Sequence, residues 1–152
     1  MNLYRLLNNK NKEKEKLRRE NKKMKTKKRV ELLAPAGNME KLKTAFHFGA
    51  DACFVGGSAF NLRGMSSNFK NKELKEAVDY VHSLGKKIYV TLNIFAHNTE
   101  IEYMPRFIKK LDEFGVDAVI VADLGVFQMV RQHAPNLKIH VSTQANNTNW
   151  MS

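Results

Sequence analysis

Five short apolar runs recur between residues 30 and 152, and a longer amphipathic stretch separates each run from the next. The runs are Glu31–Ala34, Ala52–Val55, Lys87–Leu92, Ala118–Ala122 and Lys138–Val141. Continuous apolar runs of this length are typical of strands buried on both faces, as in a parallel sheet. The intervening stretches repeat apolar residues at the spacing of one helix face, as in Leu74, Ala77, Val78 and Val81.

The joints between these segments also repeat. Phe48–Ala52 reads Phe-Gly-Ala-Asp-Ala, and Phe114–Ala118 reads Phe-Gly-Val-Asp-Ala. Glycine suits the left-handed residue that closes a helix, so each joint predicts a helix end followed at once by a strand. Gly49, Gly85 and Gly115 lie 36 and 30 residues apart, about the length of one strand–helix unit.

Strands and helices in strict alternation demand a parallel sheet, which leaves two architectures: a doubly wound open sheet and part of a barrel. The first strand–helix turn, Ala34–Asn38, is not a glycine-rich dinucleotide loop, which weakens the first alternative. A complete barrel takes about 250 residues. We therefore predict an α/β fold of the parallel (β/α) TIM-barrel type, incomplete, with about five strands and four helices. Residues 30–152 would be the N-terminal half of a (β/α)8 barrel.

Most of the net charge of +11 belongs to the first 29 residues, which hold 13 Lys and Arg against 3 Asp and Glu. Residues 30–152 hold 13 and 12, so the predicted barrel segment is nearly neutral. We expect residues 1–29 to be a disordered or helical basic tail, either a solvated extension or a weak, salt-sensitive arm for RNA. No run reaches the roughly 18 apolar residues of a spanning helix. We expect a cytoplasmic protein that does not enter a membrane.

In such folds the chemistry gathers where strands end and helices begin. Residues at those ends are the candidate substrate-binding residues: Gly56, Gly57, Asn61, Arg63, Asn93, Asp123, Gln144 and Asn146. The two glycines form either a plain turn or an anion site made by bare backbone N–H groups. Arg63 either grips a carboxylate or phosphate or makes a surface ion pair. Asp123 either caps a helix or serves in the site.

The sequence gives no catalytic residue. It holds no paired-histidine or paired-cysteine spacing for a metal and no nucleophile elbow. Its single cysteine, Cys53, has the setting of a small apolar residue in a buried strand. We therefore expect neither a metal nor a cofactor on this chain.

Several stretches together resemble the N-terminal region of peptidase family U32, the collagenase-like peptidases. They are Glu31–Gly37, Gly49–Ala52, Phe60–Arg63, Thr91–Asn93, Ala122–Gly125 and His140–Gln144. The order and spacing of these motifs match the family from about residue 30 to residue 150. The run Asn61–Ser66 is most similar to the branch of prephenate-dependent tRNA uridine hydroxylation proteins.

The resemblance implies that this chain is the N-terminal fragment of a parent that acts in tRNA uridine hydroxylation or in peptide hydrolysis. It implies tRNA or a peptide as substrate, a small anionic metabolite such as prephenate as a ligand, and an iron–sulfur cluster held by cysteines beyond Ser152. On this interpretation the chain alone is inactive and requires its C-terminal half or an oligomer. The alternative is a catalytically silent barrel fragment with a weak RNA-binding tail.

Overall fold

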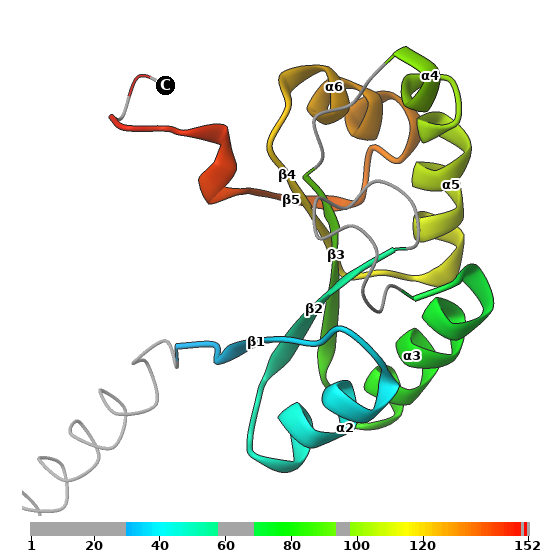
Figure 1. Cartoon of the computed structure of the whole chain (residues 1–152), viewed down its shortest axis with the longest axis vertical. Helices are drawn as coiled ribbons and strands as arrows, with labels where there is room; N and C mark the ends of the chain where they lie inside the picture. The colour runs from blue at the N-terminus through cyan, green and yellow to red at the C-terminus, as the bar shows by residue number, and fades with distance from the viewer. Residues whose placement is uncertain (1–29, 58–68, 94–97, 150, 152) are drawn as a thin grey trace, which may run out of the picture. The chain divides into compact units, whose positions relative to one another are not determined.

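The computed structural model describes residues 30–57, 69–93, 98–149 and 151, and all of these except Val30 belong to one compact unit, Glu31–Ser152. Its strands and helices follow one another in the alternation that the apolar runs predict (Figure 1). The elements are β1 (Leu33–Pro35), α2 (Met39–His47), β2 (Ala52–Gly56), α3 (Asn71–Ser83), β3 (Lys87–Leu92), α4 (Asn98–Ile101), α5 (Met104–Phe114), β4 (Ala118–Val121), α6 (Leu124–His133), β5 (Lys138–Val141) and a 3-10 turn, η1 (Thr143–Ala145).

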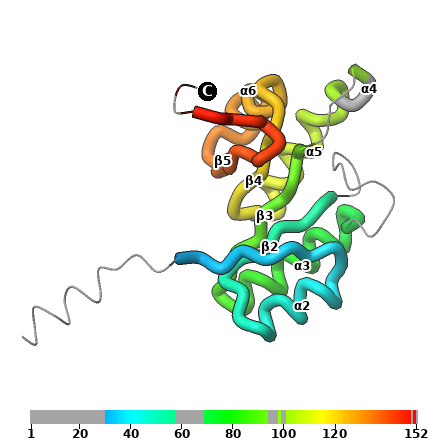
Figure 2. The backbone as a smooth tube through the Cα atoms, turned by 60° about the vertical axis from the view of Figure 1, so that its left-hand side comes forward, coloured from blue at the N-terminus to red at the C-terminus, as the bar shows by residue number. Residues whose placement is uncertain are grey.

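The five strands form one parallel sheet in chain order, β1-β2-β3-β4-β5 (Figure 2). Each strand therefore returns beside its predecessor, and a right-handed crossover always returns over the same face of the sheet. Helices α2, α3, α5 and α6 accordingly cover one face only (Figure 1). A doubly wound sheet would reverse its order once and carry helices on both faces, so the barrel-type prediction is confirmed.

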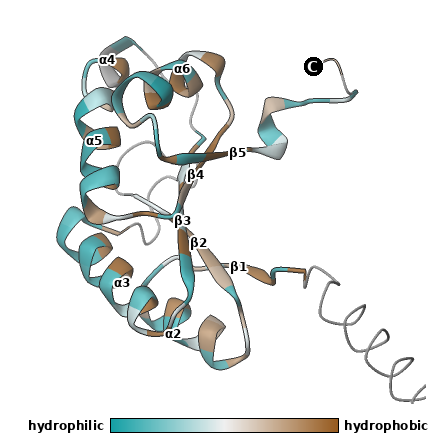
Figure 3. Ribbon diagram, turned by 180° about the vertical axis from the view of Figure 1, so that it is seen from behind, coloured by the Kyte–Doolittle hydropathy of each residue, from teal (hydrophilic) through white to brown (hydrophobic). Residues whose placement is uncertain are grey.

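The helix-covered face holds the main core. Alternate strand residues point into it, among them Cys53, Val55, Ile88, Val90, Leu92, Val119 and Val121. They meet the apolar helix stripes that contain Leu42, Leu74, Val78, Ile108, Leu111, Val126 and Val130. Each such side chain stabilises the fold by about 1.5–3 kcal/mol when fully buried. In Figure 3 the outward sides of α3 and α5 are mostly hydrophilic, which is the pattern expected of helices with one buried stripe.

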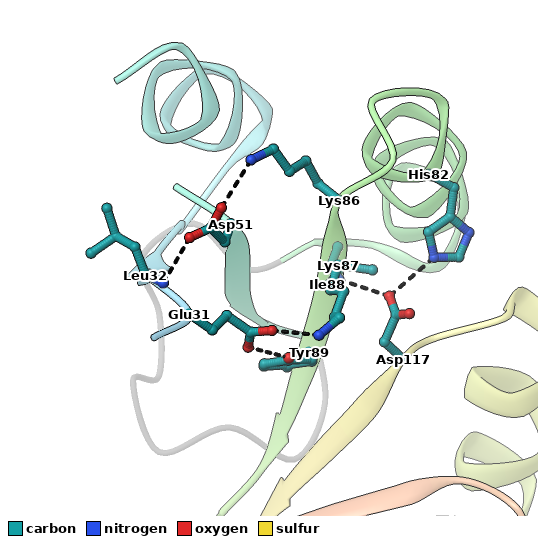
Figure 4. A network of polar contacts seen from close by, with 9 residues as sticks. All are labelled: Glu31, Leu32, Asp51, His82, Lys86, Lys87, Ile88, Tyr89 and Asp117. Carbon is teal, nitrogen blue, oxygen red and sulfur yellow. Dashed lines mark hydrogen bonds and ion pairs between the residues drawn. The ribbon is translucent and has the colours of Figure 1, made fainter. Parts of the chain in front are cut away.

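The repeated Gly-x-Asp joints fasten neighbouring strands together at the N-terminal end of the sheet. Gly49 and Gly115 end α2 and α5 with positive φ angles of 97° and 79°, a backbone conformation that glycine adopts without strain. Each following aspartate then pairs with the backbone of the strand before it (Figure 4). Asp51 Oδ2 accepts the Leu32 N–H at 3.1 Å, and Asp117 Oδ2 accepts the Ile88 N–H at 2.9 Å.

Basic side chains complete both aspartate sites. Lys86 Nζ lies 3.2 Å from Asp51 Oδ1, and His82 Nε2 lies 3.0 Å from Asp117 Oδ2. Lys86 directly follows Gly85, the glycine that lies between Gly49 and Gly115 in the repeat. A residue beside one repeated glycine therefore binds the aspartate that follows another. The sequence repeat is thus a repeated backbone anchor, in which each carboxylate has a basic partner.

Some details differ from the sequence prediction. The first strand begins at Leu33 rather than Glu31, and the Glu31 carboxylate accepts hydrogen bonds from Lys87 and Tyr89 of β3. The one-turn helix α4 adds a fifth helix to the predicted four among the described residues. Helix α3 begins at Asn71, and its cap residue is Lys70, whose N–H donates to Glu73 Oε2 at 2.9 Å.

None of the described helices is long and apolar enough to cross a membrane. The basic segment 1–29 lies outside the described residues, so its disordered or helical character stays a prediction.

Replacing Asp117 with alanine tests the backbone anchor. The Ile88 N–H would lose its charged acceptor in a partly buried setting, and we expect the free energy of unfolding to fall by about 1–3 kcal/mol. The matched control is Asp79→Ala, which removes an exposed carboxylate paired with Lys75 one helix turn away. That control should cost at most about 0.5 kcal/mol. Urea unfolding of both variants measures the difference, and equal losses would contradict the anchor.

Candidate functional site

All five strands point the same way, so their carboxyl ends meet at one edge of the sheet, where parallel α/β proteins bind ligands. The strand register shows which residues share a level there. Gly56 pairs with Thr91 and Leu92 pairs with Val121, which in turn pairs with Val141. Continuing this register by one residue sets Asn93, Ala122 and Ser142 at one level.

The face of the sheet opposite the helices carries the other half of each strand alternation, and we call it the inner face. Toward its N-terminal end it is apolar and aromatic, with Ala52, Phe54, Tyr89, Ala118 and Ile120 packed together. Among the described residues no helix covers this face (Figure 1). Leu33 at one edge strand remains 39% exposed and Val141 at the other 59%, so the two edge strands are open to solvent.

A polar network joins Glu31, just before β1, to β3 on the inner face, and a ring contact extends it to β5. Glu31 accepts hydrogen bonds from Tyr89 Oη and Lys87 Nζ (Figure 4). The Tyr89 ring meets the His140 ring edge-on, with centroids 4.8 Å apart. The bonds from Lys87 and Tyr89 hold the pKa of the Glu31 carboxyl below its ordinary value. Burial, with the Glu31 carboxylate beside it, raises the pKa of the Tyr89 phenol, which therefore stays protonated as a donor.

Toward the carboxyl end the inner face becomes polar. Thr91 is buried and its Oγ1 donates to the Val55 carbonyl at 3.2 Å. Asn93 follows directly after β3 and is partly buried. Its Oδ1 is enclosed and has no hydrogen-bond partner, the only such side-chain atom among the described residues. A buried carbonyl oxygen left unpaired costs about 1–3 kcal/mol, so such atoms are rare in folded proteins.

Gly56 and Gly57 have at least one structural task. The Gly56 carbonyl accepts the Phe69 N–H at 3.1 Å, and Gly57 forms an isolated parallel bridge with Phe69. Phe69, the first described residue after Gly57, thus lies beside the end of β2. Gly56 is the last residue of β2 and Gly57 pairs beyond it, and the turn and anion-site alternatives for the two glycines both stay predictions.

Asp123 caps helix α6. Its Oδ1 accepts the Val126 N–H at 2.9 Å, as Asn38 Oδ1 accepts the Lys41 N–H at the start of α2. A Cβ atom at Gly125 would lie 3.0 Å from Asp123 Oδ1, so glycine at that position leaves room for the cap. The capping alternative therefore accounts for Asp123, and a role in ligand binding stays a prediction.

The polar stretch after β5 forms a short turn. Ser142 continues the sheet through its N–H, which donates to the Val121 carbonyl at 2.8 Å. Its Oγ accepts the Gln144 N–H at 3.2 Å and caps η1. Asn146 ends the turn with a φ of 55°. Gln144 and Asn146 both lie on this turn beyond the sheet, and their predicted contact with a substrate stays a prediction.

A pocket of about 480 Å³ opens between the N-termini of α2 and α3. It is lined by Gly37, Asn38, Met39, Glu40, Phe69, Glu73 and Glu76. Sequence reasoning missed it, because Phe69, Glu73 and Glu76 lie far along the chain from the first turn. The spacing of residues in the sequence does not indicate that the N-termini of these two helices lie together. No three metal-ligating side chains come together in the part of the chain that the structure describes.

Two of the predicted site residues, Asn61 and Arg63, lie outside the described residues. Of the six others, Gly56, Gly57, Asn93 and Asp123 lie at the carboxyl ends of β2, β3 and β4. Thr91 was not among the predicted site residues, although the alternation within Lys87–Leu92 places it on the same face as Tyr89.

Comparisons with known proteins match both the sequence and the fold. The model of peptidase family U32 matches residues 37–152. The chain is 47% identical to "tRNA hydroxylation protein P1" of Bacillus subtilis over 123 residues, covering 81% of this chain and 29% of that protein. It is 40% identical to an Escherichia coli 23S rRNA 5-hydroxycytidine synthase over 116 residues, covering 76% of this chain and 17% of that protein. The chain thus spans less than a third of either relative.

Two solved structures share the fold. A U32 peptidase superposes with a TM-score of 0.62 at 17% identity, covering 77% of this chain and 50% of that chain. The HMG-CoA lyase of Bacillus subtilis superposes with a TM-score of 0.57 at 18% identity, covering 74% of this chain and 44% of that chain. At these identities the superpositions establish the fold and nothing about chemistry.

The acid sensitivity of the Glu31 network follows from the direction of the Glu31 shift. Because its folded-state pKa is lowered, the network contributes its full stability above the ordinary value of 4.5 and loses it as the pH falls through the folded-state value. We expect Glu31→Gln to melt at a lower temperature than the wild type at pH 7. The two melting temperatures should converge once the pH lies below the folded-state pKa of Glu31. Glu113→Gln, on the exposed side of α5, is the control. A difference between Glu31→Gln and wild type that is constant from pH 7 to pH 3 would contradict the network.

Proposed function

This chain belongs to peptidase family U32, and from that premise we propose that it supplies the N-terminal part of the substrate-binding barrel of an RNA-hydroxylation protein. The observation that carries the proposal is the 47% identity to a tRNA hydroxylation protein, over 81% of this chain. The similarity to an rRNA hydroxycytidine synthase supports RNA as the substrate class.

The geometry supports a site at the carboxyl end of the inner face. That end carries Thr91, Asn93 and Ser142, whereas the opposite end is apolar and closed by the Glu31 network. Binding groups at the carboxyl end and stabilising groups at the amino end are the usual division in (β/α) barrels. The two exposed edge strands support the further proposal that this segment works with additional protein, either the rest of a parent barrel or a second copy.

The anionic-ligand hypothesis extends the proposal. An acidic small molecule such as prephenate would need a cation and N–H donors, for which the sequence offers Arg63 and the backbone of Gly56 and Gly57. Its support is the family resemblance and the place of these glycines at the end of β2.

The cofactor hypothesis assigns an iron–sulfur cluster to cysteines beyond Ser152. Cys53 does not fit as a ligand of such a cluster, because it is fully buried on the helix side of β2 and burial raises the pKa of its thiol to about 11. A cluster requires thiolates, so no step of the proposed function runs through Cys53.

The same observation makes Cys53 unsuitable as the nucleophile of a cysteine peptidase. A thiol with a raised pKa and no access to solvent is an inert cysteine. RNA hydroxylation is the function that we propose for the parent on the similarity to its relatives, and the described residues serve it as a binding surface.

A hybrid protein tests the proposal. The background is a Bacillus subtilis strain that lacks both tRNA hydroxylation proteins, P1 and P2. Into it we return P1 with its matched 123-residue segment replaced by the segment from this chain. We expect mass spectrometry of total tRNA to recover the hydroxylated nucleoside. Asn93→Ala in the hybrid should lower its amount at least about tenfold, the effect of about 1.4 kcal/mol. Asn136→Ala, an exposed asparagine just before β5 at the opposite end of the sheet, should not. A soluble, folded hybrid that yields no hydroxylated nucleoside would contradict the proposal.

A further inference from the structure

The unpaired oxygen of Asn93 sets a chemical requirement on whatever binds beside it. Oδ1 is enclosed and lacks a hydrogen-bond donor, while the residue as a whole is only partly buried. Because Oδ1 has no partner, rotation of the amide about its last side-chain torsion breaks no hydrogen bond of that oxygen. Such a rotation would bring Oδ1 out of its enclosure toward a ligand, and a ligand that donates to it removes the penalty of an unpaired carbonyl.

The position of Asn93 fixes the direction from which a ligand approaches. The side chains of Ile88, Val90 and Leu92 pack under the helices, and those of the alternate residues lie on the inner face. Continuing the alternation past Leu92 places Asn93 on the inner face, level with Ser142 on the far side of Ala122. A planar ligand that binds over the carboxyl end of the sheet would turn its edge toward Asn93 and Ser142.

We propose that Asn93 reads the hydrogen-bonding edge of a pyrimidine base, a role that rests on the RNA substrate proposed above. A side-chain amide offers one acceptor beside one donor. Uracil presents the complementary pair, N3–H to Oδ1 and O4 to Nδ2–H. Cytosine presents it through N4–H and N3, so one asparagine serves either base of this class. A base removed from its stack exposes this edge, and enzymes that modify bases read it in this way.

Nucleotide binding to the full 152-residue chain tests the proposal. The probes are uridine 5′-monophosphate and its 3-methyl derivative, which keeps the shape of the base and loses the N3–H donor. We expect uridine monophosphate to shift the side-chain amide resonances of Asn93 and to bind the wild type at least about fivefold more tightly than the methylated probe. In Asn93→Leu that preference should disappear, and in Asn136→Leu it should persist.

The outcomes separate this proposal from the broader one. Equal affinity of the wild type for both probes, or no binding of either, overturns base reading by Asn93. A preference that survives in Asn93→Leu also overturns it. An electrophoretic shift with tRNA is measured in parallel on the same preparations. If tRNA binds and the nucleotides are not discriminated, only the role of Asn93 fails; if tRNA does not bind either, the proposed RNA substrate loses its support as well.

Discussion

The parallel pairing of strands in strict chain order is the constraint on which the rest of this structure depends. Every strand must return by a right-handed crossover, so every crossover helix falls on the same face of the sheet. One face of the sheet then forms the helix-covered core. The other, the inner face, carries the alternate side chains of each strand. The same constraint brings the five carboxyl ends to one edge, where Asn93, Asp123 and Ser142 follow their strands.

The two ends of the sheet are used differently, and the side chains explain how. At the amino end, carboxylates from Glu31, Asp51 and Asp117 accept hydrogen bonds from neighbouring strands and from lysine or histidine. Their hydrogen-bonding capacity is used within the protein. At the carboxyl end, the Asn93 oxygen has no partner, and polar side chains follow the strands. A ligand adds free energy where such capacity remains unused, which favours the carboxyl end as the binding surface.

The sequence predicted the strand–helix order because apolar runs and helical spacing are local signals, and the Gly-x-Asp repeat marks two joints directly. It did not reveal the partners of Asp51 and Asp117, which lie 19 and 29 residues away, at Leu32 and Ile88. Strand ends indicated Asn93 and Asp123 as candidates, yet only the folded structure separates a satisfied helix cap from an unpaired oxygen. The pocket around Phe69, Glu73 and Glu76 needed the packing of α2 against α3, which no spacing encodes.

We propose that RNA contacts this segment at the carboxyl end of its inner face. Photo-crosslinking with tRNA that carries 4-thiouridine, followed by mass spectrometry of the crosslinked peptides, tests it most directly. The account predicts crosslinks at Asn93 and along Ser142–Asn147, and few at Glu31, Lys86 or Lys87. Crosslinks confined to residues 1–29 or to the outer surfaces of α2, α3 and α5 would contradict it.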